Sequence, residues 1–333
     1  MGGALSGVGL YSREILYGLA AAQPEVRFRF CYRPHRYFRS WRENLPANVR
    51  RSLLAEPLGP RSADLFHGLN QRLPHFPLRA AVATFHDLFV LTGEYSTAEF
   101  RARFAAQARQ AAAGSKAIIT VSAFTKSQVV SLLGVDPAQV HVVHHGSRNL
   151  VYPRGLTREK IILNVGAIQK RKNIARLVEA FETVDSAWRL VLAGSAGFGS
   201  EEILARIGKS PACDRIRVLG YVPPEELAGW YVRASVFAFP SLDEGFGMPL
   251  LEAMSAGTPV LASNSSALPE VAGDAALLVD PEDVAGLAQG LRDLTQKREL
   301  REELAVRGLQ RASLFTWENA VRQTWAVYRK ILA

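Results

Sequence analysis

The chain has 333 residues, which is long for one typical domain and a natural length for two. Apolar residues make up 48% and charged residues 21% of the sequence, as in ordinary globular proteins, and no stretch is apolar for long enough to span a bilayer. The two cysteines, Cys31 and Cys213, are too few for a disulfide framework or a zinc site, and no signal peptide is evident, so we expect a cytoplasmic protein.

The net charge of +9 is concentrated in the first half, where residues 1–155 carry 19 basic and 9 acidic residues. The density is highest between Arg27 and Arg51, where arginines are interleaved with aromatic residues; we call this segment the 27–51 patch. Such a patch attracts nucleic acid, an anionic membrane or a phosphorylated ligand, and a solvated arginine-rich face has the same composition. Because no nucleic-acid-binding motif accompanies it, we expect no nucleic-acid partner and retain peripheral contact with an anionic membrane face.

Short apolar runs alternate with longer amphipathic segments, which is typical of α/β domains with parallel sheets. In the first half the pattern predicts strands at 26–32, 65–67, 81–85, 117–121 and 140–144, each apolar throughout, and helices at 11–22, 97–114 and 122–133, the last capped by Ser122. The residues around Gly7 and Gly9 are expected to form the glycine turn that normally follows the first strand of a doubly wound domain. No strand precedes this turn in the sequence. We therefore expect the first strand to be absent, either because the sequence starts inside a longer gene product or because the strand has been lost.

The second half repeats the alternation more clearly. It predicts strands at 161–165, 189–193, 216–219, 235–239, 259–262 and 276–279, and helices at 174–184, 203–208, 250–256, 284–294, 298–310 and 318–333. Residues 152–157 have the composition of a linker. We therefore expect an N-terminal Rossmann-like domain at 1–155, a second one at 156–312, and a C-terminal helix at 313–333 that packs back on the first domain.

The densest motif lies between Ser241 and Gly257. Two glutamates, Glu244 and Glu252, flank a glycine-rich turn and the start of a helix. A turn of this kind points backbone N–H donors and the positive end of a helix at an anion or a sugar. Glu252, one turn into the helix, can accept hydrogen bonds from two vicinal hydroxyl groups, whereas Glu244 would lie in the turn beside the ligand. Chance spacing of two surface glutamates is the alternative interpretation.

This stretch resembles the E-x7-E signature of retaining glycosyltransferases of family 4. The family has the GT-B architecture, in which two Rossmann-like doubly wound domains face each other across a cleft. Further segments match the family in the same order along essentially the whole chain. They are Gly7-Val-Gly9-Leu-Tyr11, Phe66-His67-Gly68, Thr84-Phe-His86-Asp87-Leu88, Val121-Ser122, Val165-Gly166, Arg171-Lys172-Asn173, Gly220-Tyr221, Leu268-Pro-Glu270 and Phe315-Thr-Trp317.

The resemblance implies a role for each residue of the motif. Glu252 would bind the ribose of a nucleotide-sugar donor, and Glu244 would hold the donor sugar. The amides of the turn would assist, at Gly245, Phe246, Gly247 and Met248.

The resemblance also implies a phosphate site at the basic pair Arg171 and Lys172, which looks like the clamp on the leaving diphosphate; a solvated loop is the alternative. Gly166, and the turn at Gly7 and Gly9, would lie close to the donor. Some family members carry an arginine directly after the glycine that matches Gly166. This chain has Ala167 there, so the clamp is expected to have fewer cations than usual.

His86 follows the strand predicted at 81–85 and therefore lies at the carboxyl end of a parallel strand, where ligands bind in open α/β sheets. The resemblance places it near the donor sugar and the acceptor, and a structural histidine is the alternative. Three further histidines, at positions 141, 144 and 145, have no carboxylate cluster beside them, and neither Asp87 nor Asp243 lies in a D-x-D motif. We expect an enzyme without a cofactor or metal ion.

The function that follows is transfer of a hexosyl group, mannosyl as the first choice, from GDP-mannose or a UDP-sugar to a glycan or a polyprenyl-diphosphate-linked acceptor. The resemblance is to bacterial enzymes of O-antigen (lipopolysaccharide) and exopolysaccharide synthesis. Retention would follow from front-face attack, with the leaving phosphate taking the acceptor proton. Two alternatives are a non-catalytic nucleotide-sugar, glycan or membrane-binding protein, and a same-fold epimerase or phosphorylase, which the intact Glu244–Glu252 motif disfavours.

Overall fold

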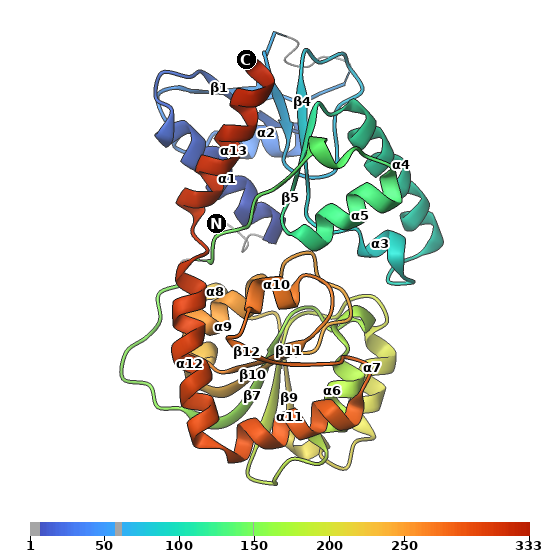
Figure 1. The fold of residues 1–333 in the computed structure, drawn as a ribbon, viewed down its shortest axis with the longest axis vertical. Helices are drawn as coiled ribbons and strands as arrows, with labels where there is room; N and C mark the ends of the chain where they lie inside the picture. Colours follow the sequence, from blue (N-terminus) through green and yellow to red (C-terminus); the bar gives the residue numbers. More distant parts are fainter. Residues whose placement is uncertain (1–6, 57–61, 149) are drawn as a thin grey trace. The chain divides into compact units, whose positions relative to one another are not determined.

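The computed structural model describes residues 7–56, 62–148 and 150–333. The chain divides into two compact units. Unit 1 comprises Met1–Leu91, Glu99–Gly146 and Thr316–Ala333, and unit 2 comprises Thr92–Ala98 and Ser147–Phe315. In each unit helices surround parallel strands (Figure 1). No helix among the described residues is long and apolar enough to cross a membrane.

Unit 1 contains a parallel sheet of four strands in the order β3-β4-β5-β6 and a separate parallel pair, β1-β2. Its strands are β1 (Phe28–Tyr32), β2 (Val49–Leu53), β3 (Phe66–Gly68), β4 (Ala81–Phe85), β5 (Ala117–Thr120) and β6 (Val140–Val142). Its helices are α1 (Gly7–Ala22), α2 (Pro34–Ser40), α3 (Phe89–Thr92), α4 (Ala98–Gly114), α5 (Ala123–Leu133), the short η1 (Pro137–Gln139) and α13 (Trp317–Leu332); α3 and α4 each have one residue in unit 2.

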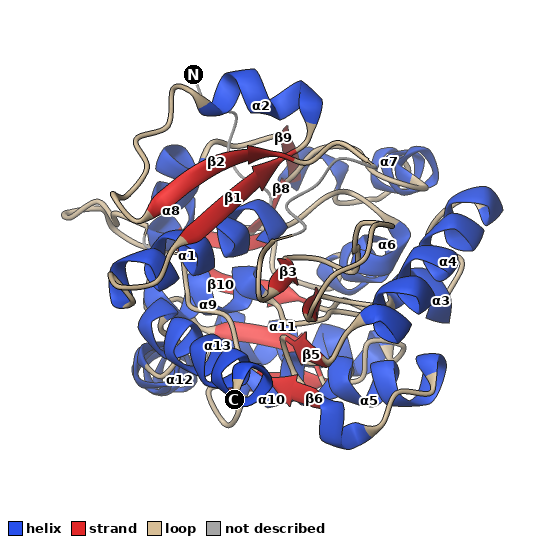
Figure 2. Ribbon diagram, turned by 90° about the horizontal axis from the view of Figure 1, so that it is seen from above, coloured by secondary structure: helices blue, strands red, loops and turns tan. Residues whose placement is uncertain are grey.

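The central strands β4 and β5 are buried along their whole length, as an apolar parallel strand covered on both faces should be. The prediction of a strand covered on both faces was wrong for β1, in which Arg29 is exposed and Phe30 is buried. The reason is that β1 belongs to a two-stranded sheet rather than to the centre of the larger one. Figure 2 shows β1 and β2 as a pair with α2 beside them; neither α2 nor β2 was predicted, because arginines interrupt the apolar pattern there.

The start of α1 also differs from the prediction. Gly7 and Gly9 lie in its first turn rather than in a loop, so the expected glycine turn is wrong at these positions. The expectation of an absent first strand falls on residues outside the described ranges. Ser122 is confirmed as the N-cap of α5, since its hydroxyl accepts a hydrogen bond from the Thr125 N–H at 3.0 Å.

The C-terminal helix α13 packs against α1 within unit 1, and in Figure 1 the two lie side by side. One face of α13 is buried, including Trp317, Val321, Thr324 and Tyr328. Helix α13 therefore belongs to the core of unit 1, although it follows the whole of unit 2 in the sequence.

Unit 2 is built on a six-stranded parallel sheet in the order β12-β11-β10-β7-β8-β9. Its strands are β7 (Glu159–Val165), β8 (Arg189–Ala193), β9 (Ile216–Gly220), β10 (Ala234–Phe239), β11 (Val260–Ser263) and β12 (Ala276–Val279). Its helices are η2 (Lys170–Lys172), α6 (Ile174–Phe181), α7 (Ser200–Gly208), η3 (Cys213–Arg215), α8 (Pro224–Arg233), α9 (Met248–Ser255), α10 (Leu268–Ala272), α11 (Val284–Gln296) and α12 (Arg298–Ser313).

The strand order of unit 2 reverses between β7 and β10. From β7 the chain proceeds to β8 and β9 on one side, then returns to β10 beside β7 and continues to β11 and β12. Ligands of doubly wound sheets bind at the carboxyl ends of the strands where the order reverses. The loops after β7 and β10 therefore mark the edge at which a site is expected, and they carry both basic residues and Glu244.

Candidate functional site

The loops after β7 and β10 meet around the carboxylate of Glu244. Its Oε2 lies 3.0 Å from Arg171 Nη1, and its Oε1 accepts a hydrogen bond from Lys172 Nζ. All three side chains are almost completely buried. Arg171 also donates to the backbone carbonyl of Asp243, and the Leu242 N–H donates to the Arg171 carbonyl at 2.9 Å. The structure thus places the basic pair in a buried ionic cluster, not in a solvated loop.

The charge state of this cluster follows from its surroundings. Burial alone would raise the pKa of Glu244, but the adjacent cations Arg171 and Lys172 outweigh burial and lower it to about 2. The Lys172 ammonium also lies 4.6 Å from the centre of the Phe239 ring, a favourable cation–π distance. Glu244 is therefore ionised over the physiological range, and two fixed cations converge on it.

The segment that follows β11 binds the backbone of Glu244. The Glu244 N–H donates to Ser266 Oγ at 3.1 Å, and the Ala267 N–H donates to the Glu244 carbonyl at 3.2 Å. Ser266 has φ of 57°, a left-handed conformation that is strained for serine. The Asn173 side chain donates to the carbonyls of Pro240 and Pro281 at 3.0 and 2.7 Å. The turn that carries Glu244 is thus fixed before any ligand binds.

The glycine-rich turn leads directly into α9. Gly247 has φ of 98°, and a Cβ added to it would lie 2.5 Å from Leu268 Cδ2, so glycine is required there. Gly245 is buried, and the Phe246 ring packs edge-on against Phe315 at 5.8 Å. Met248 is the first residue of α9. The turn is therefore shaped by backbone constraints, which is what a site built from amide donors needs.

Glu252 lies one turn into α9 and is 3% exposed. Its Oε2 accepts a hydrogen bond from the Tyr231 hydroxyl at 2.8 Å, and its Oε1 lies 3.1 Å from Arg148 Nε. The Tyr152 hydroxyl donates to its backbone carbonyl at 2.8 Å. Burial raises the pKa of Glu252, and Arg148 and Tyr231 oppose that shift. Glu252 is thus held on both carboxylate oxygens.

Gly166 follows β7 directly and lies against the loop after β8. A Cβ on Gly194 would be 1.8 Å from the Gly166 carbonyl oxygen, and the Gly166 N–H donates to the Ala193 carbonyl at 3.0 Å. This close backbone approach positions the segment that leads to Arg171 and Lys172. Ala167 adds no charge.

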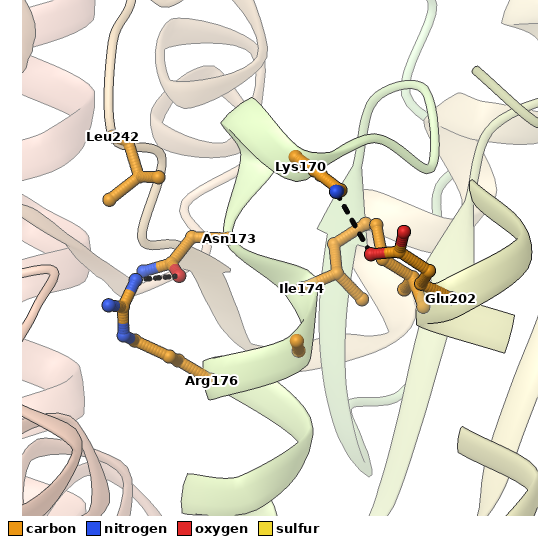
Figure 3. A pocket seen from close by; sticks show the side chains of 8 residues that line it. Lys170, Asn173, Ile174, Arg176, Glu202 and Leu242 are labelled. Atoms are coloured by element: carbon orange, nitrogen blue, oxygen red, sulfur yellow. Dashed lines mark hydrogen bonds and ion pairs between the residues drawn. The ribbon is translucent and has the colours of Figure 1, made fainter. Parts of the chain in front are cut away.

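Beside this segment lies a pocket of about 310 Å³, shown in Figure 3. It has an apolar part formed by Ile174, Ile203 and Leu242, and an ion pair between Lys170 Nζ and Glu202 Oε2 at 2.9 Å. Neither Glu244 nor Glu252 lines it. The pocket is therefore separate from the carboxylate cluster.

In unit 1 the structure places His86 at the carboxyl end of β4. Its Nε2 lies 2.9 Å from the carbonyl of Leu69, which follows β3, so Nε2 carries the proton. The ring contacts Tyr11 edge-on at 4.7 Å and His145 at 5.3 Å. Burial lowers the pKa of His86 to about 4. His86 is therefore neutral near pH 7 and its Nδ1 has acceptor character.

Two other histidines join His86 in a neutral cluster. His67 Nδ1 lies 2.5 Å from the Tyr328 hydroxyl and His67 Nε2 lies 2.7 Å from Thr84 Oγ1, which also meets the Tyr11 hydroxyl at 2.8 Å. Burial lowers the pKa of His67 to about 3 and holds that of His145 well below its usual range. The cluster ties α1, β3 and β4 to the C-terminal helix.

Gly7 and Gly9 contribute backbone N–H groups to the first turn of α1, where no acidic residue is present. The positive end of a helix is suited to an anion. Among the described residues no group of three metal-ligating side chains is present. Of the histidines at positions 141, 144 and 145, only His141 lies on a strand, β6.

Sequence reasoning missed Arg148, Tyr152, Tyr231 and Ser266. Arg148 and Tyr152 fall in and beside the segment that we predicted to be a linker, and Tyr231 lies on α8, which was not predicted. The sequence around a tyrosine in an amphipathic helix does not show whether its hydroxyl binds a carboxylate or its ring only fills the core. These contacts arise only when the segment before β7 and helix α8 meet α9, and when the loop after β11 meets the loop after β10.

Comparison with known proteins matches this chain to two adjoining family descriptions. Residues 153–311 match "Glycosyl transferases group 1" and residues 6–147 match "Glycosyltransferase Family 4". The O-antigen chain mannosyltransferase B of Escherichia coli is 34% identical over 282 residues, covering 80% of this chain and 74% of that protein. The MMP alpha-(1->4)-mannosyltransferase of Mycolicibacterium hassiacum is 36% identical over 227 residues, covering 65% of this chain and 54% of that protein.

Among solved structures, HepE of Anabaena in complex with UDP and glucose matches with a TM-score of 0.75 and 16% identity, covering 99% of this chain and 98% of that one. At this identity the match concerns the fold, and it agrees with two Rossmann-like units of the GT-B class. The chain belongs to the group 1, or family 4, glycosyltransferases. The resemblance seen in the sequence is thereby confirmed, and the chain is an enzyme of sugar transfer.

Proposed function

We propose that this glycosyltransferase moves a mannosyl group from GDP-mannose to a glycan or polyprenyl-diphosphate-linked acceptor in the synthesis of a cell-surface polysaccharide. Two mannosyltransferase relatives support the choice of sugar. The UDP complex of HepE supports a nucleotide donor and keeps a UDP-hexose as the alternative. The observation that carries the proposal is the buried cluster of Glu244, Arg171 and Lys172, followed on the next helix by Glu252.

In this proposal each group binds one part of the donor. The ionised Glu252 carboxylate accepts hydrogen bonds from the two ribose hydroxyls. Glu244 and the amides around Gly247 hold the hexosyl group. Arg171 and Lys172 stabilise the negative charge that develops on the leaving diphosphate, which is the largest electrostatic change of the reaction and needs no metal ion when fixed cations are present.

The reaction is proposed to retain the anomeric configuration. The bond between the anomeric carbon and the diphosphate oxygen breaks, and the acceptor oxygen forms its bond on the same face. The acceptor proton passes to the leaving diphosphate oxygen. His86, neutral and with Nδ1 as an acceptor, orients a hydroxyl group of the sugar or the acceptor. The contribution of the protein is then positioning and electrostatics.

The proposal includes peripheral membrane contact through the 27–51 patch, which suits a lipid-linked acceptor. Phe38 and Trp41 are 81% and 63% exposed, and the arginines around them are exposed except for the partly buried Arg51. We expect binding to vesicles with anionic lipid and little binding to neutral vesicles. Flotation with Phe38→Ser/Trp41→Ser against the parent chain tests this; binding that ignores the anionic lipid content would contradict it.

The donor site is tested by thermal unfolding with GDP, UDP, ADP and their sugar derivatives, for the parent chain and Glu252→Ala. A ligand that binds only the folded state raises Tm by mass action, so one nucleotide series should stabilise the parent chain and not the variant. Turnover with the selected donor, followed by NMR of the new anomeric centre, tests transfer and retention. Binding without turnover would favour a non-catalytic binding protein, and an inverted product would contradict retention.

A further inference from the structure

Three side chains from outside the motif contact Glu252, two at its carboxylate and one at its backbone carbonyl. Tyr231 donates to one oxygen at 2.8 Å, Arg148 Nε lies 3.1 Å from the other, and Tyr152 binds the backbone carbonyl of the same residue. The three side chains come from two separate places, α8 and the segment that follows Gly146. Nothing in the family signature requires them, since they lie outside the motif from Glu244 to Glu252.

We propose that Tyr231 and Arg148 are positioning residues that hold one oxygen each of the Glu252 carboxylate in the orientation that the donor ribose requires. The inference rests on the proposed role of Glu252. A carboxylate offers about four lone-pair directions on its two oxygens. One protein group beside each oxygen, the Tyr231 hydroxyl as donor at Oε2 and the Arg148 cation at Oε1, leaves a direction on each for the 2′ and 3′ hydroxyls. The glutamate then loses little rotamer freedom when the nucleotide binds.

Tyr231 is suited to this role because its ring is packed in the core of unit 2. The side chain is completely buried near the end of α8 and packs against Phe237 with ring centres 5.7 Å apart. A buried tyrosine hydroxyl needs a hydrogen-bond partner, and here the partner is Glu252 Oε2. The ring therefore fixes the hydroxyl, and the hydroxyl fixes the carboxylate.

Arg148 is fixed through its own segment. Ser147 donates from its N–H to the Phe315 carbonyl at 3.0 Å, and its hydroxyl lies 3.2 Å from the hydroxyl of Ser255 on α9. Tyr152 binds α9 on the other side of Arg148. Residues on both sides of Arg148 in the sequence, Ser147 and Tyr152, are therefore bound to α9, the helix that carries Glu252. Burial raises the pKa of Glu252, and the Arg148 cation counteracts this, which keeps the carboxylate able to accept both hydroxyl groups.

The test compares a ribonucleotide with the nucleotide that lacks both hydroxyls. Dissociation constants for GDP and 2′,3′-dideoxy-GDP are measured by calorimetry, with UDP and its dideoxy form in parallel, for the parent chain, Tyr231→Phe and Arg148→Gln. We expect each variant to lose about 10-fold in ribonucleotide affinity and to bind the dideoxy form as the parent does. Unchanged dideoxy binding also shows that the variants are folded.

Two matched controls isolate the effect. Tyr32→Phe removes a hydroxyl that donates to the Glu43 carboxylate at 2.7 Å, and Arg233→Gln removes a cation paired with Glu159 at 2.5 Å. Both should leave the ratio of the two affinities unchanged. A steady-state comparison adds a second readout, since the positioning variants should raise KM for the donor more than they lower kcat.

The pH profile separates the two residues. Arg148 lowers the pKa of Glu252 more than Tyr231 does, so loss of either residue raises this pKa and loss of Arg148 raises it further. Discrimination against the dideoxy form should therefore disappear at the highest pH in Arg148→Gln, at a lower pH in Tyr231→Phe, and at the lowest pH in the parent chain. A parent chain that binds both nucleotides equally would refute the ribose role of Glu252. A parent chain that discriminates, with variants that discriminate equally well, would overturn the positioning role and leave the proposed function intact.

Discussion

The two units place opposite kinds of side chain at the ends of their central strands. In unit 2, Glu244 and Glu252 each meet cationic partners, so the buried edge is ionic. In unit 1 the corresponding end of β4 carries His86 within a cluster of histidines and tyrosines that are neutral near pH 7. Both edges carry buried polar side chains, which are ionised at Glu244 in unit 2 and neutral at His67 and His86 in unit 1.

The difference shows two ways of burying polar groups. A buried charge is tolerated when an opposite charge lies within hydrogen-bond distance, as for Glu244 with Arg171 and Lys172. A buried histidine instead gives up its proton, as the lowered pKa values of His67 and His86 indicate. The ionic edge suits a charged diphosphate, and the neutral edge suits hydroxyl groups. Substitutions and acid should therefore affect the stability and activity of the two edges to different extents.

The largest effect should follow from removing one cation of unit 2. Lys172→Met leaves Glu244 with a single partner and removes a stabiliser of the leaving diphosphate, so we expect kcat to fall about 10²–10³-fold and Tm to drop. Turnover at saturating donor and thermal unfolding measure this. Lys170→Met is the control, because Lys170 is an exposed neighbour paired with Glu202 and should change little. Equal activity of the two variants would contradict the clamp.

Acid should destabilise unit 1 before unit 2. The folded pKa values of His67 and His86, about 3 and 4, lie below the unfolded value of 6.5, so as pH falls below 6.5 protons bind the unfolded state and stability declines. At pH 5 the loss is about 2 kcal/mol per histidine. Glu244, with a folded pKa of about 2, begins to lose its contribution to the stability of the folded state only below about pH 4.5. The raised pKa of Glu252 means that its protonation on acidification favours the folded state.

This order can be measured by hydrogen exchange at pH 7 and pH 5, corrected for the intrinsic rate and read separately for peptides of each unit. Peptides of β4 and α13 should open more readily at pH 5, whereas those of β7 and β10 should not. Equal loss of protection in both units would show that the histidine cluster does not govern acid stability.

A backbone change should affect the ionic edge through geometry alone. Gly247→Ala places a methyl group 2.5 Å from Leu268 Cδ2 at a φ of 98°, and we expect a loss of about 2–3 kcal/mol in the free energy of unfolding, with weaker nucleotide binding. Gly208→Ala, near the end of α7 with nothing within 4 Å, should be neutral or stabilising by up to about 1 kcal/mol. Urea unfolding compares them; a tolerated Gly247→Ala would mean that the turn adapts.

The smallest effect should come from the neutral edge. Tyr328→Phe removes the hydroxyl that meets His67 and should cost about 1 kcal/mol of stability without changing nucleotide affinity. Urea unfolding and calorimetry with GDP check both parts. A loss of nucleotide affinity would show that the neutral cluster contributes to the donor site of unit 2.

The sequence predicted much of the fold and of the candidate site. The bounds of β4, β8 and β12 agree with the apolar runs, because buried parallel strands are marked by continuous apolar residues. Glu244, Arg171 and Lys172 were recognised by local motifs, and the structure brings them together. Helices and strands that carry arginines, are very short or lack a regular pattern were missed, namely α2, β2, α3, α8 and α10. The catalytic and binding roles of the site residues remain predictions for the experiments above.

By itself the sequence determined the family, most of the succession of strands and helices, and the motif that contains both glutamates. Each of these follows from the types and spacing of residues that are close together in the sequence. Only the tertiary structure decided that Arg171 and Lys172 are buried against Glu244, that Tyr231 and Arg148 hold Glu252, and that His67 meets Tyr328. The physical reason is separation along the chain. Contacts such as Lys172 to Glu244, 72 positions apart, exist only once parallel strands align their carboxyl ends, and no local pattern encodes that alignment.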